Sequence, residues 1–114
     1  MKTYLLAWNP KRWKWDNIVE MSNDVKAGKT IHDRWSSGVS KRPKKGDRFF
    51  LIELGEEPKG IFASGIIEKD SYEDLHWDEE QASLGETINF VKIQYINAAN
   101  EKEPREIAGL FLIQ

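Results

Sequence analysis

The sequence predicts an α+β fold, a small mixed β-barrel flanked by a few short helices. Three observations lead to this prediction. The 114 residues are enough for one domain with a single core. Several short apolar segments are separated by turn residues, and only one early segment has helical spacing. We therefore expect residues 1–114 to form a single domain, either as a whole protein or as the N-terminal module of a longer one.

The first 28 residues are expected to form a strand and then a helix. Residues 4–8 have the apolar pattern of a short buried strand, which Asn9-Pro10 ends because proline cannot donate to a strand ladder. Asp16 is the expected N-cap of a helix over residues 17–27, which Gly28 ends. Three apolar residues of this helix are expected to face the core: Ile18, Met21 and Val25.

The middle of the chain is expected to return to extended structure. Residues 30–35 are predicted to be extended, residues 36–38 to form a turn, and residues 40–47 to form a basic loop. Residues 48–54 are mostly apolar, which is typical of a strand buried on both faces. A hairpin loop is expected over residues 55–60.

The second half of the chain reads mainly as sheet. A strand is predicted over residues 60–68, where Gly65 indicates a bulge or a close backbone approach. The acidic residues 70–85 are expected to be irregular and partly helical. Residues 86–98 alternate clearly and predict a strand, and residues 107–113 form a last apolar segment.

Composition excludes several classes of protein. The chain has no cysteine, which excludes disulfides, thiol catalysis and thiolate zinc sites. No apolar run reaches the roughly 20 residues needed to span a bilayer, and the N-terminal apolar stretch is too short for a signal peptide. We expect a cytoplasmic protein with no membrane association.

Catalysis is not expected either. The two histidines, His32 and His76, lie far apart in the sequence and in no metal-ligand spacing, so a structural or surface role is expected for each. The chain has no nucleophile motif and no phosphate-binding glycine loop, and its acidic run at residues 78–80 is typical of a solvated face. We expect no catalytic residue, metal or cofactor.

Tryptophan and charge are both distributed unevenly. Four of the five tryptophans fall in the first 35 residues, interleaved with Lys and Arg. Residues 1–48 hold 12 Lys/Arg against 5 Asp/Glu, whereas residues 49–114 hold 5 against 14. Aromatic side chains beside basic ones are typical of a surface that stacks on bases and attracts phosphates. Folding could also mix the two halves and cancel this field.

An ordered set of short motifs resembles a known family. Trp35-Ser36-Ser37-Gly38-Val39 precedes the basic loop, Gly46-Asp47-Arg48-Phe49-Phe50 follows it, and Gly60-Ile61-Phe62-Ala63-Ser64-Gly65 comes next. This order resembles the EVE domain of the PUA-like superfamily, which also includes the YTH and SRA modified-base readers. Trp8-Asn9-Pro10, with Trp13 and Trp15 after it, is similar to EVE-like domains fused to HNH-type restriction endonucleases. The resemblance covers roughly residues 3 to 70.

The resemblance implies a function for the tryptophans. It implies a protein that flips one modified base out of the nucleic acid and binds it in an aromatic cage. The base would be 5-methylcytosine or 5-hydroxymethylcytosine in DNA, and the protein would act in restriction or defence. Trp8 and Trp35 are the first choices for the cage walls, with Trp13 or Trp15 as a further wall or lid and the other of that pair as structural. The base edge would be read by Asn9, Ser36, Ser37 and the backbone near Gly38. Trp77 is expected to serve packing only.

The basic residues of the first half would hold phosphates, which positions a nucleic acid without reading its sequence. They are Lys11, Arg12, Lys41, Arg42, Lys44 and Lys45. DNA is favoured over RNA as the partner, with an HNH-type nuclease in the same parent chain or acting in trans. Two alternatives stay open: an RNA reader of a base such as N6-methyladenosine, and a small-ligand or nucleotide-binding protein that meets no polymer.

Overall fold

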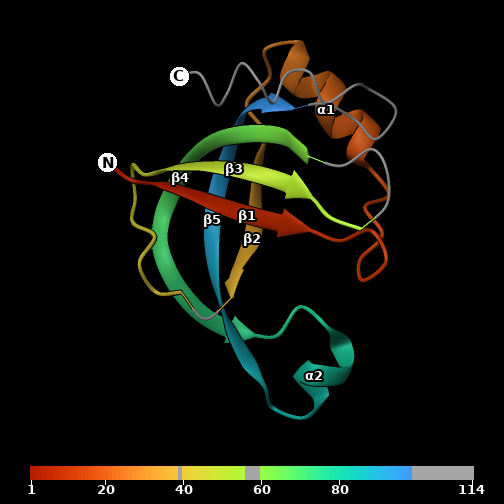
Figure 1. The fold of residues 1–114 in the computed structure, drawn as a ribbon, viewed down its shortest axis with the longest axis vertical. Helices are drawn as coiled ribbons and strands as arrows, with labels where there is room; N and C mark the ends of the chain where they lie inside the picture. Colours follow the sequence, from red (N-terminus) through yellow and green to blue (C-terminus); the bar gives the residue numbers. More distant parts are fainter. Residues whose placement is uncertain (39, 56–59, 99–114) are drawn as a thin grey trace.

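The fold of the chain is a five-stranded sheet with two helices, described here by a computed structural model that covers residues 1–38, 40–55 and 60–98 (Figure 1). The elements follow one another as β1 (Thr3–Trp8), α1 (Ile18–Lys26), β2 (His32–Gly38), β3 (Arg48–Glu53), β4 (Gly60–Leu75), α2 (Glu79–Ser83) and β5 (Thr87–Ala98). The α+β class predicted from the sequence is therefore confirmed.

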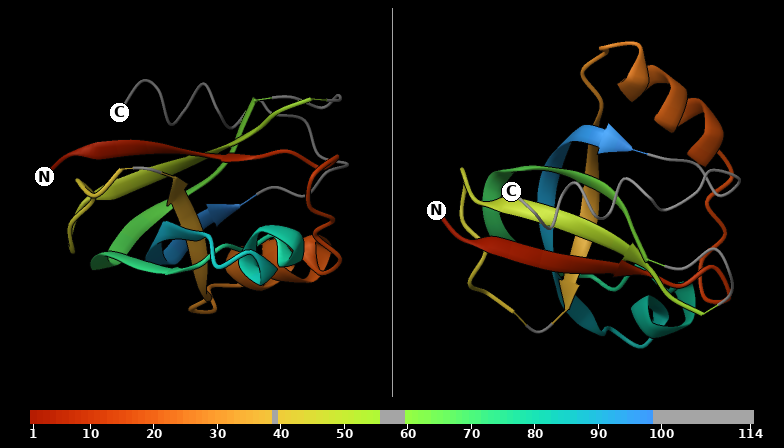
Figure 2. Two further views of the ribbon diagram at one scale, coloured as in Figure 1. Left: turned by 90° about the horizontal axis from the view of Figure 1, so that it is seen from below. Right: turned by 45° about the horizontal axis from the view of Figure 1, so that its top comes forward.

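The sheet is strongly bent but remains open in the described part of the chain. Its strand order is β1-β3-β4-β5-β2, with β1 parallel to β3 and every other pair antiparallel. Figures 1 and 2 show the long β4 curving from the β1–β3 layer into the β5–β2 layer, so that the two layers cross steeply. Register shifts interrupt the pairing of β4 with β5 at three places, which is how a strand bends without breaking its ladder.

The predicted small mixed β-barrel is not formed by the described residues, because their sheet does not close. β1 and β2 lie at opposite ends of the strand order, and no backbone ladder joins them. They nevertheless approach each other, because the indole of Trp35 on β2 donates a hydrogen bond to the carbonyl oxygen of Ala7 on β1 at 3.0 Å. A side chain thus bridges the place where a barrel would need strand pairing.

The core lies between the two layers and beneath α1. Phe49 and Leu51 of β3, Phe62 of β4 and Ile93 of β5 are fully buried within it. Helix α1 packs against β5 with the three residues predicted to face inward, Ile18, Met21 and Val25. Beyond the helix, Gly28 adopts a φ of 83°, a conformation that glycine adopts readily at a helix C-terminus.

Gly65 confirms the predicted close approach of backbones. It lies on β4 at a register shift, between β3 and β5. A Cβ atom at this position would collide with the carbonyl oxygen of Gln94 and with the ring of Phe49. The bend of β4 therefore requires a residue without a side chain here.

Several boundaries differ from the sequence predictions. The N-cap of α1 is Asn17 rather than Asp16, and it makes no side-chain capping bond. Residues 36–38, predicted as a turn, continue β2, because they pair with β5 through a bulge. Strand β4 extends to Leu75 through pairing with β5, so the acidic segment is helical only at α2. The loop at residues 56–59 and the apolar segment at 107–113 lie outside the described residues.

The strand predicted at residues 48–54 to be buried on both faces is β3, and like β1 it is buried on one face only. Their side chains alternate between buried and more exposed positions, with Leu6 and Trp8 buried on β1. The other face of β1 carries Leu5, which is exposed. An apolar sequence therefore does not require burial on both faces here.

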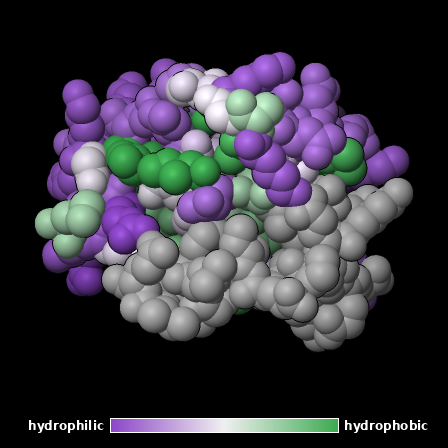
Figure 3. All heavy atoms as spheres, turned by 90° about the horizontal axis from the view of Figure 1, so that it is seen from above, coloured by the Kyte–Doolittle hydropathy of each residue, from purple (hydrophilic) through white to green (hydrophobic). Residues whose placement is uncertain are grey.

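Hydrophilic side chains dominate the face seen from above the view of Figure 1. Figure 3 shows hydrophobic residues there as separate patches among hydrophilic ones, outside the grey region. Across the described ranges, the structure has no helix long and apolar enough to cross a membrane.

Candidate functional site

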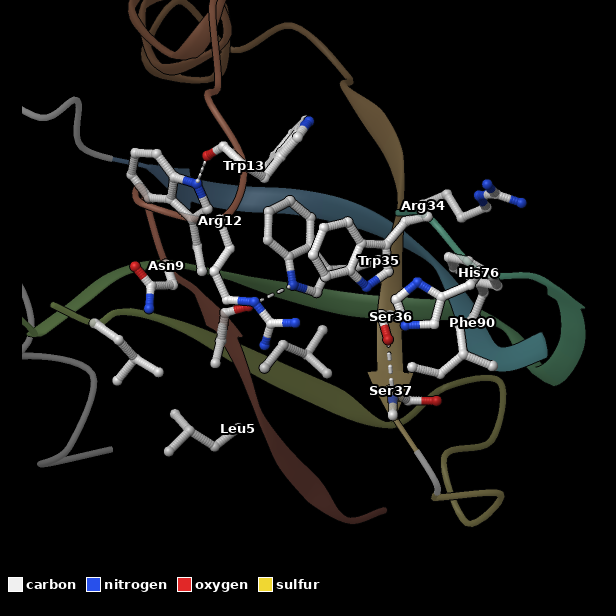
Figure 4. A pocket seen from close by; sticks show the side chains of 17 residues that line it. Leu5, Asn9, Arg12, Trp13, Arg34, Trp35, Ser36, Ser37, His76 and Phe90 are labelled. Atoms are coloured by element: carbon white, nitrogen blue, oxygen red, sulfur yellow. Dashed lines mark hydrogen bonds between the residues drawn. The ribbon is translucent and has the colours of Figure 1, made fainter. Parts of the chain in front are cut away.

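A cavity lies between the two edges of the open sheet (Figure 4). Its volume is about 610 Å³, within the range of roughly 300–1,000 Å³ that is typical of small-molecule sites. It is lined by residues 5–9 and 12–13 of β1 and the following loop, 34–38 of β2, Leu54, 76–77 after β4, and Ile88 and Phe90 of β5. The gap between β1 and β2 therefore contains this cavity.

Three tryptophans form the floor behind this cavity. Trp15 lies between Trp8 and Trp35, with ring centroids 5.4 Å and 5.1 Å away respectively. Trp8, Trp15 and Trp35 are only 4%, 6% and 7% exposed. Trp15 also contacts Phe62 and does not line the cavity, so it is the structural member of the pair Trp13 and Trp15.

The indole N–H groups of Trp8 and Trp35 are already used within the protein. Trp8 donates to the carbonyl oxygen of Trp13 at 2.9 Å, and Trp35 donates to that of Ala7. These bonds fix both rings but leave neither N–H for a ligand. Trp8 and Trp35 thus contribute apolar surface, and they do not face each other as two free walls, because Trp15 lies between them.

Trp13 is the accessible aromatic ring of the cluster. It is 42% exposed, lines the cavity, and packs edge-on against Trp35 with centroids 5.3 Å apart. Trp15 supports it from the side at 5.5 Å. A ring that is held by neighbours on one side and open on the other is suited to stacking against a flat ligand.

The loop after β1 is folded by Asn9. The side-chain oxygen of Asn9 accepts from the backbone N–H of Lys11, and its carbonyl oxygen accepts from those of Arg12 and Trp13. This compact turn places Arg12 and Trp13 at the cavity. Because the amide oxygen of Asn9 is occupied, its side chain has N–H donors to offer a ligand.

The end of β2 forms the opposite side of the cavity. The Ser36 hydroxyl accepts from the backbone N–H of Gly38 at 3.1 Å, so its own proton is available to a ligand. Gly38 has a φ of 66°, and its carbonyl oxygen accepts from the side chain of Asn89 on β5 at 3.0 Å. Ser37 donates its hydroxyl to the carbonyl oxygen of Ser40. The bulge thus has a defined shape.

The charged residues of the cavity are all basic. Arg12 and Arg34 line it, and no Asp or Glu is among its described lining residues, although the chain carries 19 acidic residues. The Arg12 guanidinium lies 5.4 Å from the ring centroid of Trp77. The Arg34 guanidinium lies 4.0 Å from that of Phe90 and forms an ion pair with Asp74 at 3.0 Å. Both guanidinium groups are thereby held against aromatic rings.

His76 adds a further donor. Its Nδ1 accepts a hydrogen bond from the backbone N–H of Asp78 at 3.0 Å. A neutral imidazole that accepts at Nδ1 carries its proton on Nε2. In Figure 4 the His76 side chain lies beside Ser36, at the same side of the cavity.

The structure brings together seven of the eight residues predicted to bind a base. They are Trp8, Asn9, Trp13, Trp35, Ser36, Ser37 and Gly38; the eighth, Trp15, lies behind them. Of the predicted phosphate-binding residues, only Arg12 lines the cavity. The others are Lys11 and the four basic residues of the loop after β2.

That basic loop is partly neutralised within the protein. Lys44 forms a long ion pair with Asp70 at 3.9 Å, and the backbone N–H of Lys45 donates to the same carboxylate. Asp47 in turn accepts from the backbone N–H groups of Lys2 and Lys44, and these bonds hold the pKa of its carboxyl below the usual value. The two halves of the sequence therefore do mix their charges at this loop.

Sequence reasoning missed nine of the lining residues, including Arg34, His76, Trp77 and Phe90. Trp77 was expected to serve packing only, and His76 to be structural. Both follow the extended β4, whose pairing with β5 carries residues 76–77 toward the loop of Arg12. The one available signal was that Trp77, like the others, is a tryptophan in a short chain.

A smaller cavity of about 280 Å³ lies on the other side of Trp13, between α1 and β2. It is acidic, since Glu20, Asp24 and Asp33 line it. Asp33 accepts a hydrogen bond from the phenol of Tyr95, and burial, together with this carboxylate, raises the pKa of that phenol well above its ordinary value. Trp13 thus separates a basic cavity from an acidic one.

Comparisons of the chain with models of protein families, with curated proteins and with solved structures find no match.

Proposed function

We propose that this protein is a nucleic-acid-binding module that takes one modified base into the cavity between β1 and β2. The observation that carries the proposal is the lining of that cavity: exposed aromatic surface at Trp13, two arginines and no acidic residue among those described. A flat ligand with anionic groups matches such a lining, and a nucleotide in a polymer is of that kind.

The energetics of base flipping are compatible with one accessible stacking ring and a fixed polar edge. Extracting a base costs a few kcal/mol of unstacking and unpairing. Stacking on an aromatic side chain returns about 1–3 kcal/mol per base. Hydrogen bonds from Asn9 and Ser36, whose donors are available, add to this. The resemblance to the EVE domain supports the same reading, and it makes 5-methylcytosine or 5-hydroxymethylcytosine in DNA the favoured targets and a restriction or defence role the favoured setting.

A modification adds a small apolar or polar group to the base, which is worth at most about 1–3 kcal/mol of discrimination. The apolar side chains of Leu5, Ile88 and Leu54 at the cavity are candidates for contact with a methyl group. A preference of about tenfold, equivalent to about 1.4 kcal/mol, is therefore the expected scale.

The test is a binding series with fluorescently labelled oligonucleotides. DNA duplexes with cytosine, 5-methylcytosine or 5-hydroxymethylcytosine at one position are compared with RNA that carries adenosine or N6-methyladenosine. Preferential binding of a modified DNA, weakened by added salt because phosphates are contacted, supports the proposal. Equal binding of modified and unmodified oligonucleotides contradicts it, and preference for the modified RNA identifies RNA as the target.

The informative variant is Trp13→Ala rather than Trp35→Ala. Trp35 is buried and hydrogen-bonded to β1, so its removal would disturb the fold as well as the cavity. Trp13 is exposed, and its loss should remove the preference for the modified base while weak binding to any oligonucleotide persists. Leu84→Ala is the matched control, because Leu84 is exposed and lies outside the cavity lining.

A further inference from the structure

We infer that the cavity holds the phosphate of the same nucleotide whose base it takes, through Arg12, Arg34 and His76. A single nucleoside monophosphate is then a sufficient ligand, without the rest of a polymer. The choice of base rests on the function proposed above, whereas the phosphate subsite rests on these three side chains.

Arg12 is available to an anionic ligand. Its guanidinium forms no hydrogen bond or ion pair with any described residue and lies 5.4 Å from the ring centroid of Trp77. Figure 4 shows it extending toward the middle of the cavity. A cation in that place, close to apolar surface, is strengthened as a partner for an anion because the aromatic walls displace water.

Arg34 also keeps hydrogen-bond donors that its partners in the protein do not use. Only one nitrogen, Nη1, donates to Asp74, so the guanidinium retains further donors that no described residue uses. The ring of Phe90 holds its plane at 4.0 Å, and the Asp74 pair orients it. Figure 4 shows this side chain beyond Trp35, near His76 and Phe90 and on the opposite side of the cavity from Arg12. A pre-oriented fork is the geometry that binds phosphate oxygens through two parallel hydrogen bonds.

Several polar side chains around the cavity offer hydrogen-bond donors. Asn9 and Ser36 each accept one backbone N–H group and have donors available for a ligand. His76 offers its Nε2–H, because its Nδ1 accepts a backbone N–H group. Ser37 differs, because its hydroxyl donates to the carbonyl oxygen of Ser40. With no Asp or Glu among the described lining residues, the cavity favours a ligand that supplies acceptors, and a phosphate supplies the most.

The experiment compares two small probes by titration calorimetry with the full chain: 5-methyl-2′-deoxycytidine and its 5′-monophosphate. We expect the monophosphate to bind at least about tenfold more tightly than the nucleoside. In Arg12→Gln and in Arg34→Gln the monophosphate should lose most of this advantage, while the affinity for the nucleoside changes little.

Two controls separate the subsite from general charge. Lys45→Gln removes a charge of equal sign from the loop after β2, outside the cavity, and should leave the advantage unchanged. Asp74→Asn removes the carboxylate that competes for Arg34, so the affinity advantage of the monophosphate should be preserved or increased. Equal affinity for both probes in the wild type, absence of binding for both, or an advantage that survives both arginine substitutions would overturn the inference.

The outcome is independent of the oligonucleotide series. If the monophosphate binds better than the nucleoside but modified and unmodified duplexes bind equally, the subsite stands and the proposed reading of a modified base falls. If duplexes are discriminated but the two small probes bind equally, the reader stands and the subsite is wrong.

Discussion

The indole nitrogen of Trp35 lies 3.0 Å from the carbonyl oxygen of Ala7, and this hydrogen bond joins the two edge strands of the described sheet. It takes the place of a strand ladder between β2 and β1. The same contact fixes the width of the gap in which the cavity lies. Shape and candidate function therefore depend on one side chain that is itself 7% exposed.

Trp35→Phe tests this bridge. The variant keeps an aromatic ring in the core but loses the donor, so the free energy of unfolding should fall by about 1–2 kcal/mol. Trp35→Ala also leaves a cavity and should cost about 3–5 kcal/mol. Urea unfolding followed by circular dichroism measures both. A phenylalanine variant as stable as the wild type would show that the bond to Ala7 contributes nothing.

Substitutions of Trp13 and Trp15 should have clearly different effects on stability, although only one residue lies between them in the sequence. Trp15→Ala removes a buried ring that contacts five other aromatic residues and should lower the free energy of unfolding by about 3–5 kcal/mol. Trp13→Ala removes a partly exposed ring and should cost about 1 kcal/mol or less. Urea unfolding of the two variants side by side checks this. Equal losses would contradict the assignment of Trp15 as structural and Trp13 as accessible.

Gly65→Ala should be strongly destabilising. The added methyl group meets backbone, the carbonyl oxygen of Gln94, which cannot rotate away as a side chain can. Overpacking of this kind costs at least about 1–3 kcal/mol, measured as a lower thermal midpoint. Gly85→Ala is the comparison: its φ is 80°, but its Cβ would meet nothing, so only backbone strain of about 1 kcal/mol applies. If Gly65→Ala were less destabilising than Gly85→Ala, the close backbone approach at Gly65 would not be what constrains the bend of β4.

Asp47 should contribute to stability in a pH-dependent way. Because backbone N–H bonds from Lys2 and Lys44 lower the pKa of its carboxyl in the folded state, the unfolded chain binds the proton more tightly. The contribution is therefore complete above about pH 4 and is lost as the pH falls through the lower, folded pKa. Asp47→Asn should be less stable at neutral pH and should show a flatter acid limb in urea unfolding. An unchanged acid limb in this variant would count against the role of these bonds.

Local patterns predict much of this fold. The alternation of residues 86–98, the apolar spacing of α1 and the glycine at position 65 each report a constraint that acts within a few residues or on one strand. Seven of the eight predicted base-binding residues also line one cavity, because Trp8 to Trp13 and Trp35 to Gly38 lie at two strand ends that the sheet brings together.

The features of the fold and of the candidate site that local patterns do not predict depend on tertiary contacts. The acidic residues 70–75 have weak strand character by themselves and become strand by pairing with β5, and this carries Trp77 and His76 to the cavity. Likewise, no local pattern says which of Trp13 and Trp15 is buried, since both flank one lysine. Which of the two side chains is buried depends on the residues that the loop packs against, and these are Trp8, Trp35 and Phe62.

The most direct measurement is the affinity of the wild type and of Trp13→Ala for two DNA duplexes that differ only in 5-methylcytosine against cytosine at one position. The account predicts a preference of about tenfold for the modified duplex in the wild type, and its loss in the variant with weak binding retained. Equal affinity of the wild type for both duplexes, or an undiminished preference in Trp13→Ala, would contradict it.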